Sequence, residues 1–217
     1  MRLLRSTVCM VVLLLSAGGA AAAQGVPLER RMGFEVFTGA LDTEAAETQG
    51  TADRMWGGQL NFGVTAFRVL SLGVDGGFVG IRDRRPFTEE TTEGEMESTV
   101  GGVVGSLVAG LHTPPLGLAP NHAADVTLGV NGGLTWVGAD RSINRCIDCT
   151  LERVRIHAGG FWEPALHVFH GKGGLSARYR VYGAGSDLRN ALMIGYVLRT
   201  GRRDLAPADP QPLPPTP

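Results

Sequence analysis

The stretch that decides the fold is Gly174–Leu198, which reads GLSARYRVYGAGSDLRNALMIGYVL. Apolar side chains occupy every second position on both sides of a short Gly-Ala-Gly-Ser-Asp turn. Because successive side chains of a β-strand point to opposite faces, the pattern predicts a hairpin with one apolar face and one face that accepts charge. The apolar face carries Leu175, Ala177, Tyr179, Val181, Leu192, Ile194, Tyr196 and Leu198, and the other carries Ser176, Arg178, Arg180, Tyr182, Met193, Gly195, Val197 and Arg199.

The same alternation recurs upstream, and no helical period of useful length interrupts it. Six further strands are predicted over Met32–Ala40, Met55–Phe67, Leu70–Gly80, Ser98–Leu111, Ala124–Gly138 and Arg153–Phe169. Pro164 lacks a ladder donor, so a bulge or break is expected there. The charged stretch Ile81–Glu97 is predicted to be a loop. Eight sequential strands suit an all-β, antiparallel up-and-down barrel, which leaves no exposed sheet edge.

The first 23 residues have the pattern of a secretory signal peptide. Arg2 and Arg5 precede the apolar run Val8–Leu15, which is shorter than the roughly 20 residues of a membrane-spanning helix. Small residues at Ala21–Ala23 favour cleavage, with an uncleaved anchor as the alternative. We expect a lead-in over residues 24–31, a barrel domain over 32–200 and a Pro-rich tail over 201–217.

The overall charge excludes one class of partner. The formal charge is −1, and it becomes −3 without residues 1–23, because Arg2 and Arg5 leave and no acidic residue does. This balance, without a basic patch interleaved with aromatic residues, argues against nucleic acid. Glycine occurs 32 times, which indicates closely packed and strongly bent strands.

The distribution of charge predicts that the barrel is inside out, with a polar lumen. The apolar faces are almost free of charge, and the opposite faces hold too few charges for a soluble surface. One arginine on the lipid face near the midplane costs about 2–4 kcal/mol, so Arg178 and Arg180 are predicted to face inward. A lumenal network that plugs the narrow interior is predicted from Glu35, Asp75, Arg155, Glu163, Arg178 and Arg180.

Four large aromatic residues fall on the predicted outer faces. They are Trp56, Trp136, Tyr179 and Tyr196. Such side chains either form interfacial girdles or pack as ordinary hydrophobic groups, and the sequence leaves both interpretations open.

With this secretion signal, these alternating strands and this glycine-rich lumenal face, the chain resembles the small bacterial outer-membrane β-barrels of the OmpA/OmpX type. The resemblance spans about Met32–Arg199 and rests on pattern, not on a strict motif. It implies a location in the bacterial outer membrane, with outer-membrane lipid, lipopolysaccharide and the barrel assembly machinery as partners. It also implies periplasmic termini and four external loops, at Leu41–Arg54, Ile81–Glu97, Ala139–Glu152 and Ala184–Arg189.

Two features depart from that family. His112–Ala123 is long for a periplasmic turn. A Pro-rich tail follows the last strand, where many such barrels end on an aromatic residue.

Cys146 and Cys149 form a CxxC motif in a predicted loop. Such a motif can be a redox site, half of a zinc site or a local disulfide. An exported chain without a βαβ pattern or a second ligand pair favours the disulfide. Redox and metal roles are the alternatives.

Two charged clusters lie in the predicted loop over Ile81–Glu97. Arg82, Arg84 and Arg85 offer bidentate contacts to lipopolysaccharide phosphates at the outer rim, with a solvated loop as the alternative. The acidic run Glu89–Glu97 lacks the spacing of a calcium loop, so solvation is favoured there.

His157, His167 and His170 raise the alternative of a lipid A- or phospholipid-modifying barrel enzyme. No His-x-Ser motif accompanies them, and structural histidines are favoured. We therefore expect a non-enzymatic outer-membrane barrel with a structural or surface-interaction role, without catalytic residues, metal or cofactor. A secreted soluble β-barrel that binds a small apolar ligand is the third alternative.

Overall fold

The computed structural model describes residues 28–41, 53–89, 92–118, 124–143, 152–154, 156–157 and 159–201. The predicted signal peptide, Cys146, Cys149, Arg155 and the tail from residue 202 lie outside these ranges, as does most of the predicted lead-in. No helix among the described residues is long and apolar enough to span a membrane.

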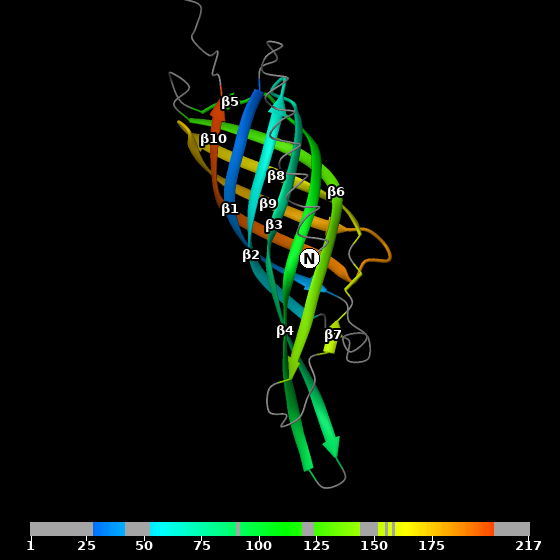
Figure 1. Cartoon of the computed structure of the whole chain (residues 1–217). Coiled ribbons are helices and arrows are strands. Elements are labelled where there is room, and N and C mark those ends of the chain that lie inside the picture. The colour runs from blue at the N-terminus through cyan, green and yellow to red at the C-terminus, as the bar shows by residue number, and fades with distance from the viewer. Residues whose placement is uncertain are drawn as a thin grey trace, which may run out of the picture.

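The described strands form one antiparallel sheet. Their bounds are β1 (Leu28–Leu41), β2 (Asp53–Ala66), β3 (Leu70–Glu89), β4 (Thr92–His112), β5 (Leu116–Gly117), β6 (Ala124–Ile143), β7 (Glu152–Val154), β8 (Gly160–His170), β9 (Gly173–Tyr182) and β10 (Leu188–Gly201). The order around the sheet is β4-β3-β2-β1-β10-β9-β8-β6, and the pairing of β4 with β6 closes it into a barrel (Figure 1).

The wall of this barrel has eight strands. The short strands β5 and β7 add none, because both pair with β6: β5 continues the edge occupied by β4, and β7 precedes β8 on the other edge. The closed eight-stranded antiparallel barrel predicted from the alternating pattern is confirmed.

The first and last strands of the barrel lie side by side. Their pairs run from Glu29↔Gly201 to Leu41↔Leu188, so the C-terminal hairpin meets the first strand as predicted. The chain enters and leaves at the same end, which we call the terminal end. We call the opposite end the hairpin end, because the β3–β4 hairpin projects there beyond the other strands (Figure 1).

The prediction of a loop over Ile81–Glu97 is wrong. β3 continues to Glu89 and β4 begins at Thr92, although β2 stops pairing with β3 at Arg82. The charged composition of this stretch predicts a loop, but charge by itself does not exclude a strand in a hairpin that extends past its neighbours. The backbone register pairs Arg84 with Glu97.

The predicted strand over Arg153–Phe169 breaks at a different place than expected. Residues 155–159 separate β7 from β8, whereas Pro164 lies inside β8. Pro164 pairs with Val130 of β6, and the ladder to β9 omits it without any shift of register. Because proline has no N–H, β8 lacks ladder pairing with β9 at this position, but no bulge forms.

The outer wall of the barrel is apolar. Large hydrophobic side chains on all eight strands are exposed, among them Phe34, Leu60, Val103, Leu134 and Leu175. Trp56, Tyr179 and Tyr196 are exposed on the same wall, as predicted. The half-buried Trp136 packs over Gly105, where an added Cβ would lie 2.4 Å from its ring.

The lumen is polar in its middle and apolar at the hairpin end. The apolar part, which we call the apolar layer, consists of the buried residues Phe37, Leu41, Met55, Val79, Ile81, Leu188, Ala191 and Met193. This layer is not among the features predicted from the sequence, although Phe37 and Met193 alternate in phase with polar lumenal positions.

Candidate functional site

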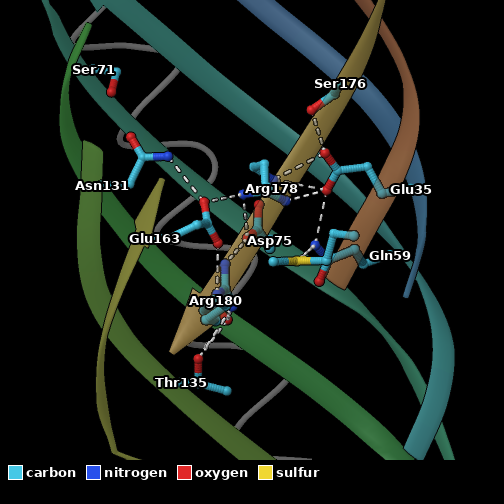
Figure 2. A network of polar contacts seen from close by, with 12 residues as sticks. Glu35, Gln59, Ser71, Asp75, Asn131, Thr135, Glu163, Ser176, Arg178 and Arg180 are labelled. Carbon is cyan, nitrogen blue, oxygen red and sulfur yellow. Dashed lines mark hydrogen bonds and ion pairs between the residues drawn. The ribbon is translucent and has the colours of Figure 1, made fainter. Parts of the chain in front are cut away.

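Five buried charged side chains meet in the middle of the lumen. Glu35 comes from β1, Asp75 from β3, Glu163 from β8, and Arg178 and Arg180 from β9 (Figure 2). Each lies at an inward position of a strand whose neighbouring side chains face outward, as strand alternation requires. We call this group the charged layer.

Arg178 joins all three carboxylates of the charged layer. Its Nε donates to both oxygens of Glu35, each at 3.0 Å, and its Nη2 also contacts this carboxylate. Its Nη1 lies 3.2 Å from Asp75 Oδ2 and 3.1 Å from Glu163 Oε1. One guanidinium therefore links strands on opposite sides of the lumen.

Arg180 makes a second set of contacts nearer to the hairpin end. Its Nε donates to Glu163 Oε2 and its Nη2 to Asp75 Oδ2, both at 2.8 Å. Its Nη1 donates to Ser106 Oγ at 2.7 Å. The guanidinium carbon also lies 3.8 Å from the centre of the Phe161 ring, within cation–π range.

Neutral side chains bind the carboxylates from outside the charged layer. Gln59 Nε2 donates to Glu35 Oε2 at 3.0 Å, and Ser176 Oγ donates to Glu35 Oε1 at 2.8 Å. Asn131 Nδ2 donates to Glu163 Oε1 at 3.0 Å (Figure 2). A buried charge is tolerated only when it is paired and hydrogen-bonded, and these contacts meet that condition.

A glycine allows Glu35 to lie against the neighbouring strand. Gly195 of β10 is its register partner, and a Cβ on Gly195 would lie 2.6 Å from both the Cα and the Cγ of Glu35. Any larger residue at this position would push Glu35 away from Arg178.

A second buried ion pair lies at the terminal end of the lumen. Arg199 Nη1 donates to Asp125 Oδ1 at 2.8 Å, and Arg199 Nε donates to the carbonyl of Gly171 at 3.2 Å. The guanidinium carbons of Arg199 and Arg31 lie 4.0 and 5.6 Å from the centre of the buried Phe169 ring. This pair is not among the residues predicted for the lumenal network, although strand alternation places both of its members on lumenal faces.

The three histidines considered for catalysis are not brought together. His167 is buried in the lumen, His170 is exposed, and His157 is exposed beside Asp187 at 3.3 Å. Ser176 is the register partner of His167, but its hydroxyl donates to Glu35. Among the described residues, none of these three histidine rings is hydrogen-bonded to a serine hydroxyl.

A further histidine, His112, occupies the lumen beside His167, with ring centres 5.8 Å apart. Its Nε2 lies 2.8 Å from Ser71 Oγ. Within the described ranges, no three His, Cys, Asp or Glu side chains are grouped to hold a metal ion.

Arg82, Arg84 and Arg85 lie on β3 near the hairpin end, seven to ten residues after Asp75 of the charged layer on the same strand. The backbone register pairs Arg82 with Arg54 of β2 and with Thr99 of β4. Two of the three, Arg84 and Arg85, fall in the part of the hairpin that projects beyond β2.

An apolar outer wall around a lumen filled with ion pairs defines the class of protein. It is an eight-stranded β-barrel of the transmembrane type, in which the polarity of a soluble barrel is reversed.

Several solved structures are similar to this chain. Neisserial surface protein A has 9% identity and a TM-score of 0.44, over 80% of this chain and 97% of its own. Ail of Yersinia pestis, solved with the heparin analogue sucrose octasulfate, has 16% identity and a TM-score of 0.44, over 81% and 99%. The outer-membrane protein OprG of Pseudomonas aeruginosa has 9% identity and a TM-score of 0.47, over 82% and 97%.

No family model and no curated protein sequence matches the chain. The assignment of the fold therefore comes from the strand register and closure of this chain itself.

Proposed function

We propose that this chain is a bacterial outer-membrane barrel that is closed to solutes and has a structural or surface-interaction role without catalysis. The observation that supports this best is the pairing of an apolar outer wall with a lumen occupied by the charged layer. A wall of exposed Leu, Val, Phe and Trp side chains requires lipid around it, because such a surface would drive association in water.

The charged layer acts as the plug in this proposal. Cavities of about 70 Å³ and about 20 Å³ lie towards the terminal end and the hairpin end, and members of the charged layer line both. Arg178 and Arg180 are held by several charge-assisted contacts each, so clearing a path would break contacts that are strong in a low dielectric.

The surface role is proposed for the hairpin end. Arg82, Arg84 and Arg85 lie where β3 leaves the barrel, a position suited to lipopolysaccharide phosphates if this end is external. A disulfide between Cys146 and Cys149 is proposed to clamp the loop that follows β6. Mass measurement of the alkylated protein with and without reductant tests that bond.

Fractionation and gel mobility test the membrane assignment. We expect the chain in the outer-membrane fraction, with a band that shifts on heating in detergent. Release of the folded chain in soluble form without detergent would contradict the assignment and favour the soluble, ligand-binding alternative.

Conductance and enzyme assays test the closed, non-catalytic role. The reconstituted protein should give no steady current in planar bilayers. It should also release no acyl chain from lipopolysaccharide or phospholipid. An acyl-release activity that His167→Ala abolishes in a folded protein would establish the enzyme alternative.

A further inference from the structure

A groove crosses the outer wall near the terminal end of the barrel. It measures about 330 Å³ and spans β3, β2, β1 and β10. Its apolar lining includes Met32, Phe62, Leu72, Val74 and Leu198, and Arg30 lies at its edge.

The register explains why the wall is hollow there. Val74, Phe62, Met32 and Leu198 lie in one row across the four strands. Val74 is only 7% exposed although it belongs to the outer face, whereas Leu72, two residues earlier on the same strand, is 57% exposed. Val74 therefore forms the floor of the groove, and larger side chains form its rims.

Arg30 places a positive charge at one end of this apolar surface. It lies in the next row of the outer wall, between Val64 and Thr200, and no described side chain pairs with its guanidinium. The position is two residues from Met32, or about 7 Å along the strand towards the terminal end. An arginine on the lipid face costs about 0–1 kcal/mol near the interface, which suits a place at the depth of lipid headgroups.

We propose that the groove binds an anionic phospholipid, with its phosphate on Arg30 and one acyl chain along Met32, Phe62 and Val74. This inference rests on the proposed membrane location. The planar guanidinium offers two parallel donors to a phosphate. A free phosphate would leave the apolar surface uncovered, and an extended peptide would find no unpaired backbone groups on a closed wall.

A second hollow in the outer wall provides an internal control. It measures about 400 Å³ and lies across β8, β9 and β10, where Val168, Leu175 and Tyr196 line it. Among the residues that the structure describes, no arginine or lysine lines this hollow. It should hold acyl chains without a preference for lipid charge.

Native mass spectrometry of the refolded full chain tests the site. The protein is released from detergent after incubation with phosphatidylglycerol or phosphatidylcholine, and the retained lipid is counted. Both lipids offer a phosphate to Arg30, but the choline cation of phosphatidylcholine cancels its negative charge, so the wild type should bind phosphatidylglycerol with roughly ten-fold higher affinity. Arg30→Ala should abolish that preference, and Arg30→Lys should keep part of it.

Two further variants separate the groove from the rest of the wall. Val74→Phe fills the floor and should lower phosphatidylglycerol retention, whereas Val168→Phe in the second hollow should leave the preference unchanged. Equal retention of both lipids by the wild type, or an unchanged preference in Arg30→Ala, would overturn the proposal. If the chain shows no heat-dependent gel shift and stays soluble without detergent, the membrane assignment itself fails, which is a different result.

Discussion

The charged layer and the apolar layer are neighbours along the axis of the same lumen, but different interactions hold them together. In the charged layer, Arg178 and Arg180 reach carboxylates on three strands, and every contact has a defined donor and acceptor. In the apolar layer, side chains such as Phe37, Ile81 and Leu188 are held by packing, and Met193 Sδ also accepts a hydrogen bond from Gln59 Nε2 at 3.1 Å.

The difference shows how a narrow barrel can specify its structure. Hydrogen-bonded ions accept only one arrangement, because a misplaced partner leaves a buried charge without compensation. Apolar packing is more tolerant, since volume-conserving changes repack at small cost. We infer that the charged layer fixes which strands face each other across the lumen, and that the apolar layer fills lumenal volume.

The largest effect is expected from Arg178→Met, which keeps the approximate size of the side chain and removes its charge. Glu35 then has no guanidinium partner, and Asp75 and Glu163 share Arg180 alone, so the free energy of unfolding should fall by about 3–5 kcal/mol. Urea titration of the protein in lipid vesicles, followed by heat-dependent gel mobility, measures this. A loss below about 1 kcal/mol is the range of an exposed ion pair. It would mean that the two layers do not differ in how strictly they specify their contacts.

The next largest loss of stability is expected when a charge is placed on the outer face of the barrel wall. Leu60→Arg places a guanidinium near the middle of the outer face of β2 and should cost about 2–4 kcal/mol in vesicles. Leu70→Arg is the matched control at the terminal end of the outer wall, where about 0–1 kcal/mol is expected. Equal costs at the two positions would mean that Leu60 is not near the membrane midplane.

A smaller effect is expected within the apolar layer. Ile81→Val removes one buried methylene and should lower the free energy of unfolding by about 0.5–1.5 kcal/mol. The same urea titration measures it. A loss of stability as large as that of Arg178→Met would show that the apolar layer tolerates substitution no better than the charged layer does.

The smallest effect is expected from salt. Buried pairs are screened much less than exposed ones, so raising the sodium chloride concentration should leave the stability of the wild type nearly unchanged. Arg178→Met should respond to salt no more than the wild type. A marked loss of wild-type stability in high salt would place the charged layer in contact with solvent.

Much of the barrel follows from strand alternation alone. The lumenal positions of Glu35, Asp75, Glu163, Arg178 and Arg180 all follow from counting by twos along each strand. The same count includes Asp125 and Arg199, which were overlooked because each stands near the end of a strand. The extent of β3 and β4 could not be predicted, because charge marks water-exposed segments and does not tell a loop from a projecting hairpin.

The number of strands, the direction in which each side chain points and the reversed polarity of the barrel can all be predicted from the amino-acid sequence. The cause is local, because alternation along an extended backbone needs no partner. Only the tertiary structure decided which acid meets which arginine. Register and closure set the depth of each residue in the lumen, so that Arg178 on β9 reaches Glu35 on β1 and Asp75 on β3, neither of which lies on a neighbouring strand.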